Sequence, residues 1–251
     1  MSQFPPPPGP PTPPPYGAPQ PSGAWDLGTA FNYAWAKFQA NAAQMVLATA
    51  VLFVVAIIVG GIGFFLASLA IVGKHYACDP VTYDCRFTGG TPFPLVMLIY
   101  VMLGIVLMVI QQVFAAGIAR ASLGVTQGRP FSAAEVFSFD SNVILTGILV
   151  SVLSGIAAIF CYLPGIALFC MICWAPFFAI DKGMAPMDAI KASFAMVRAN
   201  FSSAGVWFLI GLVIYFVGEA ACGVGLLLAI PVIALGSAYT YRVLQGQPVS
   251  A

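Results

Sequence analysis

Four long stretches of this 251-residue chain carry at most one charged residue each. They are 43–72, 94–119, 142–180 and 203–241. A helix needs about 20 apolar residues to cross the roughly 30 Å hydrocarbon core of a bilayer, so the last two stretches are long enough for two crossings each. The motifs "CYLPG" (161–165) and "CGVG" (222–225) interrupt these two stretches with turn-forming residues. The sequence therefore predicts an all-α integral membrane protein with six transmembrane helices.

The composition excludes several other classes of protein. Of the residues, 61% are hydrophobic and 7% are charged, whereas an average soluble domain carries about 25% charged residues. Disordered chains are poor in apolar residues, so the chain as a whole is not disordered. The net charge of +1 argues against nucleic-acid binding, which needs clustered Lys and Arg to neutralise phosphates.

The distribution of basic residues predicts the orientation, because short cytoplasmic loops are enriched in Lys and Arg. With the N-terminus inside the cell, seven of the nine basic residues fall on the inner side and two on the outer side. The inner residues are Lys37, Arg120, Arg129, Lys182, Lys191, Arg198 and Arg242, and the outer ones are Lys74 and Arg86. We therefore expect a multi-pass protein of the plasma membrane with both termini in the cytoplasm.

Cys78 and Cys85 lie in the one sizeable outer loop, "KHYACDPVTYDCRFTGG". An oxidising compartment outside the membrane permits disulfides. Six intervening residues with a proline turn are enough for the two cysteines to meet, so we expect a disulfide between them. Two free thiols are the alternative.

Residues 1–24 hold 11 of the 20 prolines, in "MSQFPPPPGPPTPPPYGAPQPSGA". Proline fixes φ and removes a hydrogen-bond donor, so we expect a disordered, proline-rich cytoplasmic tail with polyproline II character. The tail matches PxxP several times, which favours a cytoplasmic partner protein with an aromatic-lined groove. An inert spacer is the alternative. A short cytoplasmic tail, 245–251, is expected at the other end.

A dozen residues occur twice, each time just before an apolar stretch: "AFNYAWAKFQAN" (30–41) and "AIKASFAMVRAN" (189–200). In the first copy Phe31, Ala34, Trp35 and Phe38 share one helical face, and Phe194 matches Trp35 in the second. Both copies end in asparagine, Asn41 and Asn200, although the chain holds only four asparagines. The pattern is typical of an amphipathic helix that lies in the inner membrane interface.

A weaker third copy, "FSAAEVFSFDSN" (131–142), ends at Asn142 and opens with the capping-box spacing Ser132-x-x-Glu135. The three copies predict an internal repeat of three parallel hairpins, each preceded by an interfacial amphipathic helix. The units are 25–120, 131–181 and 186–244, within one membrane domain over 25–244. The alternative is that any cytoplasmic segment before a span tends to be amphipathic.

Gln111 and Gln112 lie within a predicted span, about nine residues from Arg120 and therefore about 13 Å into the bilayer at helical rise. We expect one of them to hydrogen-bond to a neighbouring helix, with contact to a substrate as the alternative. The sequence shows no phosphate-binding loop, metal-ligand spacing or nucleophile–base pair. We therefore expect no catalytic residues, no cofactor and no metal site, and the chain is not predicted to be an enzyme.

The segment from Trp174 to Leu244 resembles a broad bacterial family of polytopic membrane proteins. Its markers are Asp188-Ala189, Ser193-Phe194, Ala199-Asn200, Gly223 to Gly225, Pro231 and Tyr241-Arg242. Members look like the membrane domain attached to some glycerophosphoryl diester phosphodiesterases, and the proline-rich head is similar to that of actinobacterial proline- and glycine-rich transmembrane proteins. The resemblance implies the membrane fold but no phosphodiesterase activity, because the soluble barrel has no counterpart in this sequence.

Two functional hypotheses follow. The first is a membrane-anchored interaction or scaffold module whose proline-rich tail recruits a partner; deleting residues 1–24 would then abolish recovery of that partner. The alternative is a carrier or binder of lipid or another apolar solute, with an uncharged cavity between the hairpins. Both hypotheses involve contact with membrane lipids, and neither predicts an oligomeric state.

Overall fold

The computed structural model describes residues 25–72, 75–88, 93–137, 140–160, 162–221 and 223–250. The proline-rich tail, predicted to be disordered, lies outside these residues. Six helices of the described chain are long and apolar enough to cross a membrane, which confirms the predicted class of an α-helical membrane protein with six spans. The spans are Leu27–Leu69, Pro94–Thr126, Ser141–Ile159, Leu163–Lys182, Phe201–Ala220 and Leu226–Leu244.

Helix α1 (Leu27–Val72) begins at an aspartate that caps its first turn. The Asp26 carboxylate accepts hydrogen bonds from the backbone N–H of Thr29 (2.7 Å) and from the Thr29 hydroxyl (2.9 Å). The backbone hydrogen bond has the larger effect, and together the two bonds hold the pKa of Asp26 below its ordinary value. At Asn41 the backbone leaves the helical region (φ −125°, ψ 15°), so α1 consists of a short N-terminal segment and a long second segment.

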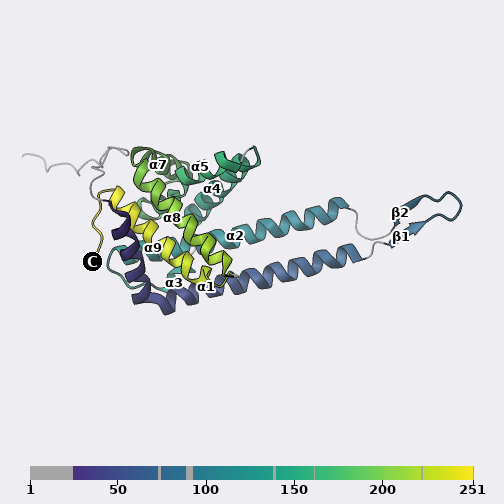
Figure 1. The fold of residues 1–251 in the computed structure, drawn as a ribbon, viewed down its shortest axis with the longest axis horizontal. Coiled ribbons are helices and arrows are strands. Elements are labelled where there is room, and N and C mark those ends of the chain that lie inside the picture. Colours follow the sequence, from purple (N-terminus) through teal and green to yellow (C-terminus); the bar gives the residue numbers. More distant parts are fainter. Residues whose placement is uncertain are drawn as a thin grey trace, which may run out of the picture.

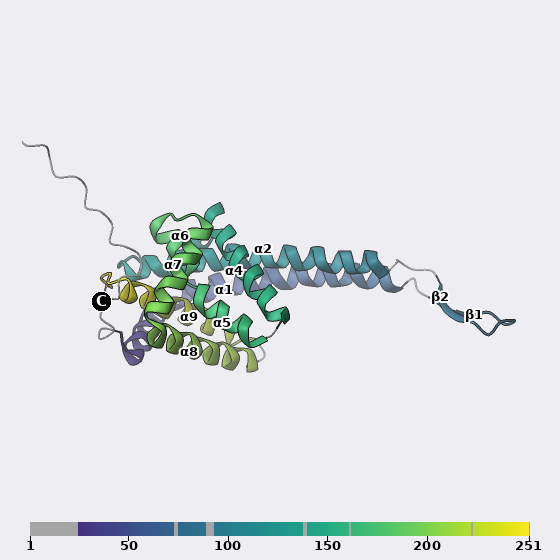
Figure 2. The ribbon, with the colours of Figure 1, turned by 90° about the horizontal axis from the view of Figure 1, so that it is seen from above.

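The long part of α1 and helix α2 (Phe93–Thr126) run side by side as a hairpin that extends beyond the other helices (Figure 1, Figure 2). A two-stranded antiparallel ribbon, β1 (His75–Cys78) and β2 (Cys85–Thr88), forms the far tip of this hairpin. The sequence predicted only a loop here. The C-terminus lies at the opposite end of the molecule.

The remaining helices pack around the half of this hairpin that lies away from the ribbon (Figure 1). They are α3 (Ala133–Val136), α4 (Ser141–Phe160), α5 (Tyr162–Ile172), α6 (Ala175–Lys182), α7 (Pro186–Ala199), α8 (Phe201–Ala220) and α9 (Leu226–Leu244). Helix α9 is the most buried of the six spans and packs against α1, α2 and α8. Helices α4 and α5 pack closely against each other, and α5 and α6 together form the fourth span.

The two matched segments before α1's long span and before α8 bury the same positions. In both, a small residue and the residue four positions later are buried, while the aromatic residue between them is 42% or 40% exposed. These residues are Ala34, Phe38 and Trp35 in the first segment, and Ser193, Val197 and Phe194 in the second. The predicted apolar face is therefore divided: Ala34 and Phe38, like Ser193 and Val197, are buried, whereas Trp35 and Phe194 point outward. Placement of these segments in the membrane interface stays a prediction.

Asn41 and Asn200 occupy equivalent corners of the backbone. Asn200 has φ −127° and ψ 39°, close to the angles of Asn41. The Asn41 side-chain amide donates to the carbonyl of Lys37 (2.9 Å), and that of Asn200 donates to the carbonyl of Met196 (3.0 Å). Each asparagine thus caps the helix that precedes it at the point where the chain turns into a span.

The third segment differs from this pattern. Asn142 is exposed in the first turn of α4, and its backbone N–H donates to Asp140 Oδ1 (3.0 Å). The helix expected over 131–142 is wrong in extent, because among the described residues of this segment the only helix that ends before α4 is the four-residue α3. Its N-cap Ser132 makes no side-chain capping bond, so the predicted capping box does not form.

The C-terminal segment over 245–250 packs against the domain, although the sequence predicted a short tail. Ser250 donates its backbone N–H to the carbonyl of Thr126 (2.9 Å) and its hydroxyl to the carbonyl of Val125 (3.2 Å). The segment therefore contacts the C-terminal end of α2.

Candidate intramembrane binding site

A cavity of about 390 Å³ lies between the helices of the bundle. Its walls come from seven of the helices, and nearly all of its lining side chains are apolar. Gln111 and Gln112, the two polar residues predicted within a span, both line it. The cavity has no charged residue in its lining, as expected for a space within the hydrocarbon region.

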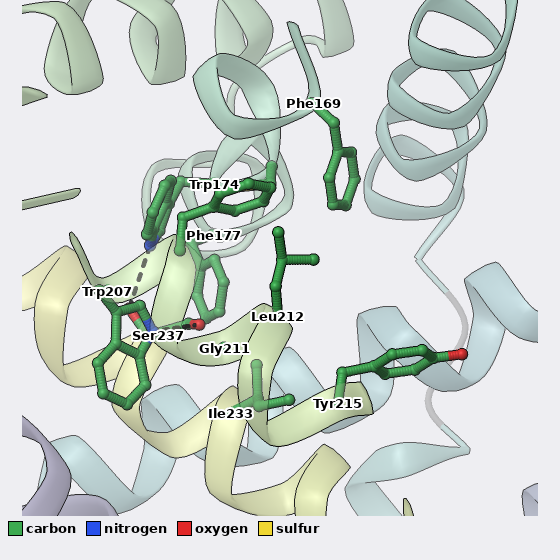
Figure 3. Close-up of a pocket in the computed structure, with 11 residues that line it drawn as sticks. Phe169, Trp174, Phe177, Trp207, Gly211, Leu212, Tyr215, Ile233 and Ser237 are labelled. Carbon is green, nitrogen blue, oxygen red and sulfur yellow. Dashed lines mark hydrogen bonds between the residues drawn. The ribbon is translucent and has the colours of Figure 1, made fainter. Parts of the chain in front are cut away.

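A second cavity of about 210 Å³ adjoins the first one and is mostly aromatic (Figure 3). Helices α5, α6, α8 and α9 supply its walls. The two cavities share six residues: Phe169, Cys173, Phe177, Tyr215, Ile233 and Ser237. The two cavities therefore lie next to each other along these six residues, and we call them together the central chamber.

Two tryptophans are fixed at the wall of the central chamber by one serine. The ring N–H of Trp207 donates to the Ser237 hydroxyl (3.0 Å), and that of Trp174 donates to the Ser237 carbonyl (3.3 Å; Figure 3). Both rings are almost completely buried, at 1% and 2% exposed. Their polar atoms are thereby satisfied, so the wall that they present to the chamber is apolar.

A helix break before α6 and a glycine on α9 determine where these two tryptophan rings lie. The fourth span breaks between α5 and α6, and Trp174 is the N-cap residue of α6. Pro176 follows in the first turn of α6, where its missing N–H costs no helical hydrogen bond. On α9, Gly236 lies directly against the Trp207 ring, and a Cβ atom at this glycine would overlap the ring. The glycine therefore lets α8 and α9 approach closely enough to bury the tryptophan.

Gln112 makes the interhelical bond predicted for one of the two glutamines. Its side-chain amide donates to the Ser151 hydroxyl on α4 (2.7 Å). A Cβ at Gly147, one turn earlier on α4, would overlap the Gln112 side chain, so the glycine provides the space for the amide. Gln111 is more exposed and makes no side-chain hydrogen bond with any described residue, which leaves its amide able to contact a bound molecule.

Cys78 and Cys85 are remote from the central chamber, at the tip of the long hairpin. They are paired across the two strands, and their sulfur atoms lie 2.09 Å apart, the separation of a disulfide. The loop between them is closed by Asp79, whose carboxylate accepts from the backbone N–H groups of Val81 (2.7 Å) and Thr82 (3.1 Å). These bonds lower the pKa of Asp79.

Of the residues singled out from the sequence, only Gln111 and Gln112 come together at the chamber. Trp35, Phe194 and the three asparagines lie elsewhere, in the segments that precede the spans. The sequence did not predict the aromatic lining, because an aromatic residue in a span can face either the lipid or the protein core, and the sequence does not distinguish the two. Trp174-Ala175-Pro176 was the available signal, since a proline inside a predicted span marks a break at which a side chain is redirected.

Within the described parts of the chain, no three His, Cys, Asp or Glu side chains gather as they would around a metal ion. The chamber lining includes one cysteine, Cys173, whose thiol donates to the carbonyl of Cys170 (3.5 Å). The arrangement can exclude water and enclose an apolar group, with Gln111 as its free polar contact.

Mycobacterial proteins are similar to this chain over nearly its whole length. The uncharacterized protein Mb2590 of Mycobacterium bovis is 31% identical over 250 residues, which cover 98% of this chain and 74% of that protein. The uncharacterized protein Rv2560 of Mycobacterium tuberculosis is 30% identical over 250 residues, with the same coverage. No family model matches the sequence, and no solved structure matches it.

Proposed function

The chain belongs to the family that includes the mycobacterial proteins Rv2560 and Mb2590, and we propose that it is a non-enzymatic membrane protein that binds the apolar chain of one lipid in its central chamber. The relation to the membrane domain of glycerophosphoryl diester phosphodiesterases remains part of this proposal. So does placement in the plasma membrane with both termini in the cytoplasm.

The central chamber is the observation that carries the proposal. Its larger cavity, about 390 Å³, falls within the roughly 300–1,000 Å³ range of ligand sites. Ligand sites also combine mostly apolar walls with a few placed polar groups, and the central chamber has this composition. In a six-span protein the molecules available in quantity to fill such a space are membrane lipids.

The interaction module inferred from the proline-rich tail remains a second proposal from the sequence alone. Residues 1–24 lie outside the described structure, so no contact of the tail bears on it. Lipid binding and recruitment by the tail are compatible, because they involve different parts of the chain.

A cavity-filling substitution tests lipid binding. Gly211 lines the chamber on α8, and a Cβ there meets only an Ile233 methyl group at 3.6 Å, so a side chain can be built there without a backbone shift. Gly211→Leu is expected to project into the chamber and displace the lipid. Gly205→Leu is the matched control, because Gly205 is on the same helix with nothing within 4 Å of its Cβ position.

The readout is native mass spectrometry of detergent-washed protein. Wild type and Gly205→Leu are expected to retain one lipid per chain, whereas Gly211→Leu is expected to lose it while keeping its circular dichroism spectrum. Equal retention by both variants, or no lipid on the wild type, would contradict the proposal.

A further inference from the structure

A polar pocket of about 260 Å³ lies next to the central chamber, toward the inner ends of α2 and α6. It differs from the chamber in carrying charge on its walls. Its lining residues are Arg120, Leu123, Gln127, Arg129, Ile180 and Asp181. We call it the inner pocket.

The inner pocket and the central chamber lie along one seam between α2 and α6. On α2, chamber and pocket residues follow each other at helical spacings of three or four, which places them on one face of the helix. They are Gln112, Ala116 and Ala119 in the chamber, then Leu123 and Gln127 in the pocket. On α6, Pro176 and Phe177 of the chamber are each followed four residues later by a pocket residue, Ile180 and Asp181.

The seam thus has an apolar end deep in the bundle and a charged end at the predicted inner surface. Gln111 and Arg120 are nine positions apart on one helix, which corresponds to about 13 Å along its axis. Amphiphilic molecules of a bilayer have the same arrangement, with a polar head at the interface and an apolar chain below it.

We propose that the seam binds a single anionic phospholipid of the inner leaflet, with its phosphate at Arg120 and Arg129 and an acyl chain in the central chamber. This inference rests on the proposed function, and it adds the chemical class of the lipid. The pocket favours a phosphate headgroup, because two of its three ionic side chains are guanidinium groups, which bind phosphate oxygens through several N–H donors.

Each of the two arginines already contacts a carboxylate, so a phosphate would share the donors of its guanidinium group. Arg120 contacts Asp140 at 3.1 Å and Arg129 contacts Glu135 at 3.2 Å. A guanidinium group has five N–H donors in a planar fork, so one edge can bind a carboxylate and another a phosphate. The Asp181 carboxylate does not oppose the phosphate with a full charge, because Arg242 lies 3.2 Å from it.

The location agrees with this headgroup. Anionic lipids give the cytoplasmic leaflet a negative surface potential, which attracts basic residues near the membrane surface. Arg120 and Arg129 belong to the basic set predicted on the inner side, and Gln127 adds an amide donor to the same pocket.

The test compares two lipid classes on the full-length chain. Wild-type protein is placed in nanodiscs that contain equal amounts of phosphatidylglycerol and phosphatidylcholine, extracted, and analysed by native mass spectrometry. We expect phosphatidylglycerol to be retained about tenfold over phosphatidylcholine, because both lipids present a phosphate but only phosphatidylcholine adds a choline cation, which the two guanidinium groups repel. Arg129→Gln is expected to abolish this preference but still retain lipid, and Arg120→Lys, which keeps the charge, is expected to preserve most of it.

Arg198→Gln is the matched control, because Arg198 is an exposed inner-side arginine on α7 that lines neither space. It should behave as wild type. Retention of both lipids without preference would overturn the headgroup assignment and leave lipid binding intact. Loss of all lipid from the wild type would overturn the proposed function itself. Competition by millimolar glycerol phosphate as effective as by the lipid would assign the pocket to free phosphate and overturn the lipid source.

Discussion

At the scale of single residues, Asp181 and Arg242 form the most buried ion pair among the described residues, at 3.2 Å with side chains 11% and 9% exposed. The carboxylate also accepts from the Tyr241 hydroxyl (3.0 Å) and from the Gln247 amide (3.1 Å). These contacts join the end of α6 to the end of α9 and to the C-terminal segment. A carboxylate so enclosed stabilises the fold only while its cation remains opposite it.

Asp181→Asn is therefore expected to lower the free energy of unfolding by about 3 kcal/mol, because it leaves the Arg242 charge buried without a counter-charge. The matched control is Asp188→Asn. Asp188 faces Lys191 at 3.8 Å with both side chains well exposed, and its loss should change stability by less than about 0.5 kcal/mol. Denaturant unfolding in detergent micelles measures both values, and equal effects would show that the buried pair has no special role.

At the scale of elements, the asparagine corners decide where a short inner segment ends and a span begins. Asn41 and Asn200 share their backbone angles and their bond to the carbonyl four residues earlier. The same position of the preceding segments is buried in both cases, as Ala34 and Ser193 show. The structure therefore gives the two copies one local geometry, while the threefold repeat stays a prediction.

Replacing Asn200 by Ala removes a buried side-chain bond and should destabilise the α7–α8 corner by about 1 kcal/mol. Asn142→Ala is the control, since the Asn142 side chain is exposed and only its backbone groups form hydrogen bonds with described residues in the first turn of α4. The thermal unfolding midpoint of Asn200→Ala should lie below that of Asn142→Ala. An Asn142→Ala variant as unstable as Asn200→Ala would restore Asn142 as a third corner.

At the scale of the whole molecule, the spans have two different lengths. The part of α1 after Asn41 and the 34 residues of α2 measure about 46 Å and about 51 Å at 1.5 Å per residue. The 20 residues of α8 measure about 30 Å, the thickness of the hydrocarbon core. Side chains on the outer part of the hairpin are apolar and exposed, such as Phe64 (66%), so we expect the hairpin to tilt within the membrane.

The orientation can be tested with single cysteines in a chain whose own cysteines are replaced by serine. Val81, in the loop between the strands, is 84% exposed, and Met187, at the start of α7, is 53% exposed. Val81→Cys should react with a membrane-impermeant maleimide on intact cells, whereas Met187→Cys should react only after the membrane is opened. The reverse pattern would invert the predicted topology, and reaction of both on intact cells would contradict it.

The sequence by itself determined the class of protein and the number of spans, because hydrophobic length is a local property that no tertiary contact is needed to create. It also identified Gln111 and Gln112, because a polar residue within an apolar stretch can be recognised without knowing how the helix packs. The recurring asparagines were informative for the same reason at 41 and 200, where the chain turns locally, but at 142 the spacing alone gave a wrong helix.

Only the tertiary structure decided where a site lies. Trp174 and Trp207 meet at Ser237 because the break before α6 and the glycine on α9 bring three helices to one point. The chamber and the inner pocket share a seam because the same faces of α2 and α6 oppose each other along their length. In a chain that is apolar on nearly every face, hydrophobic periodicity does not mark the buried side of a helix, so the convergence of side chains on a cavity follows from packing alone.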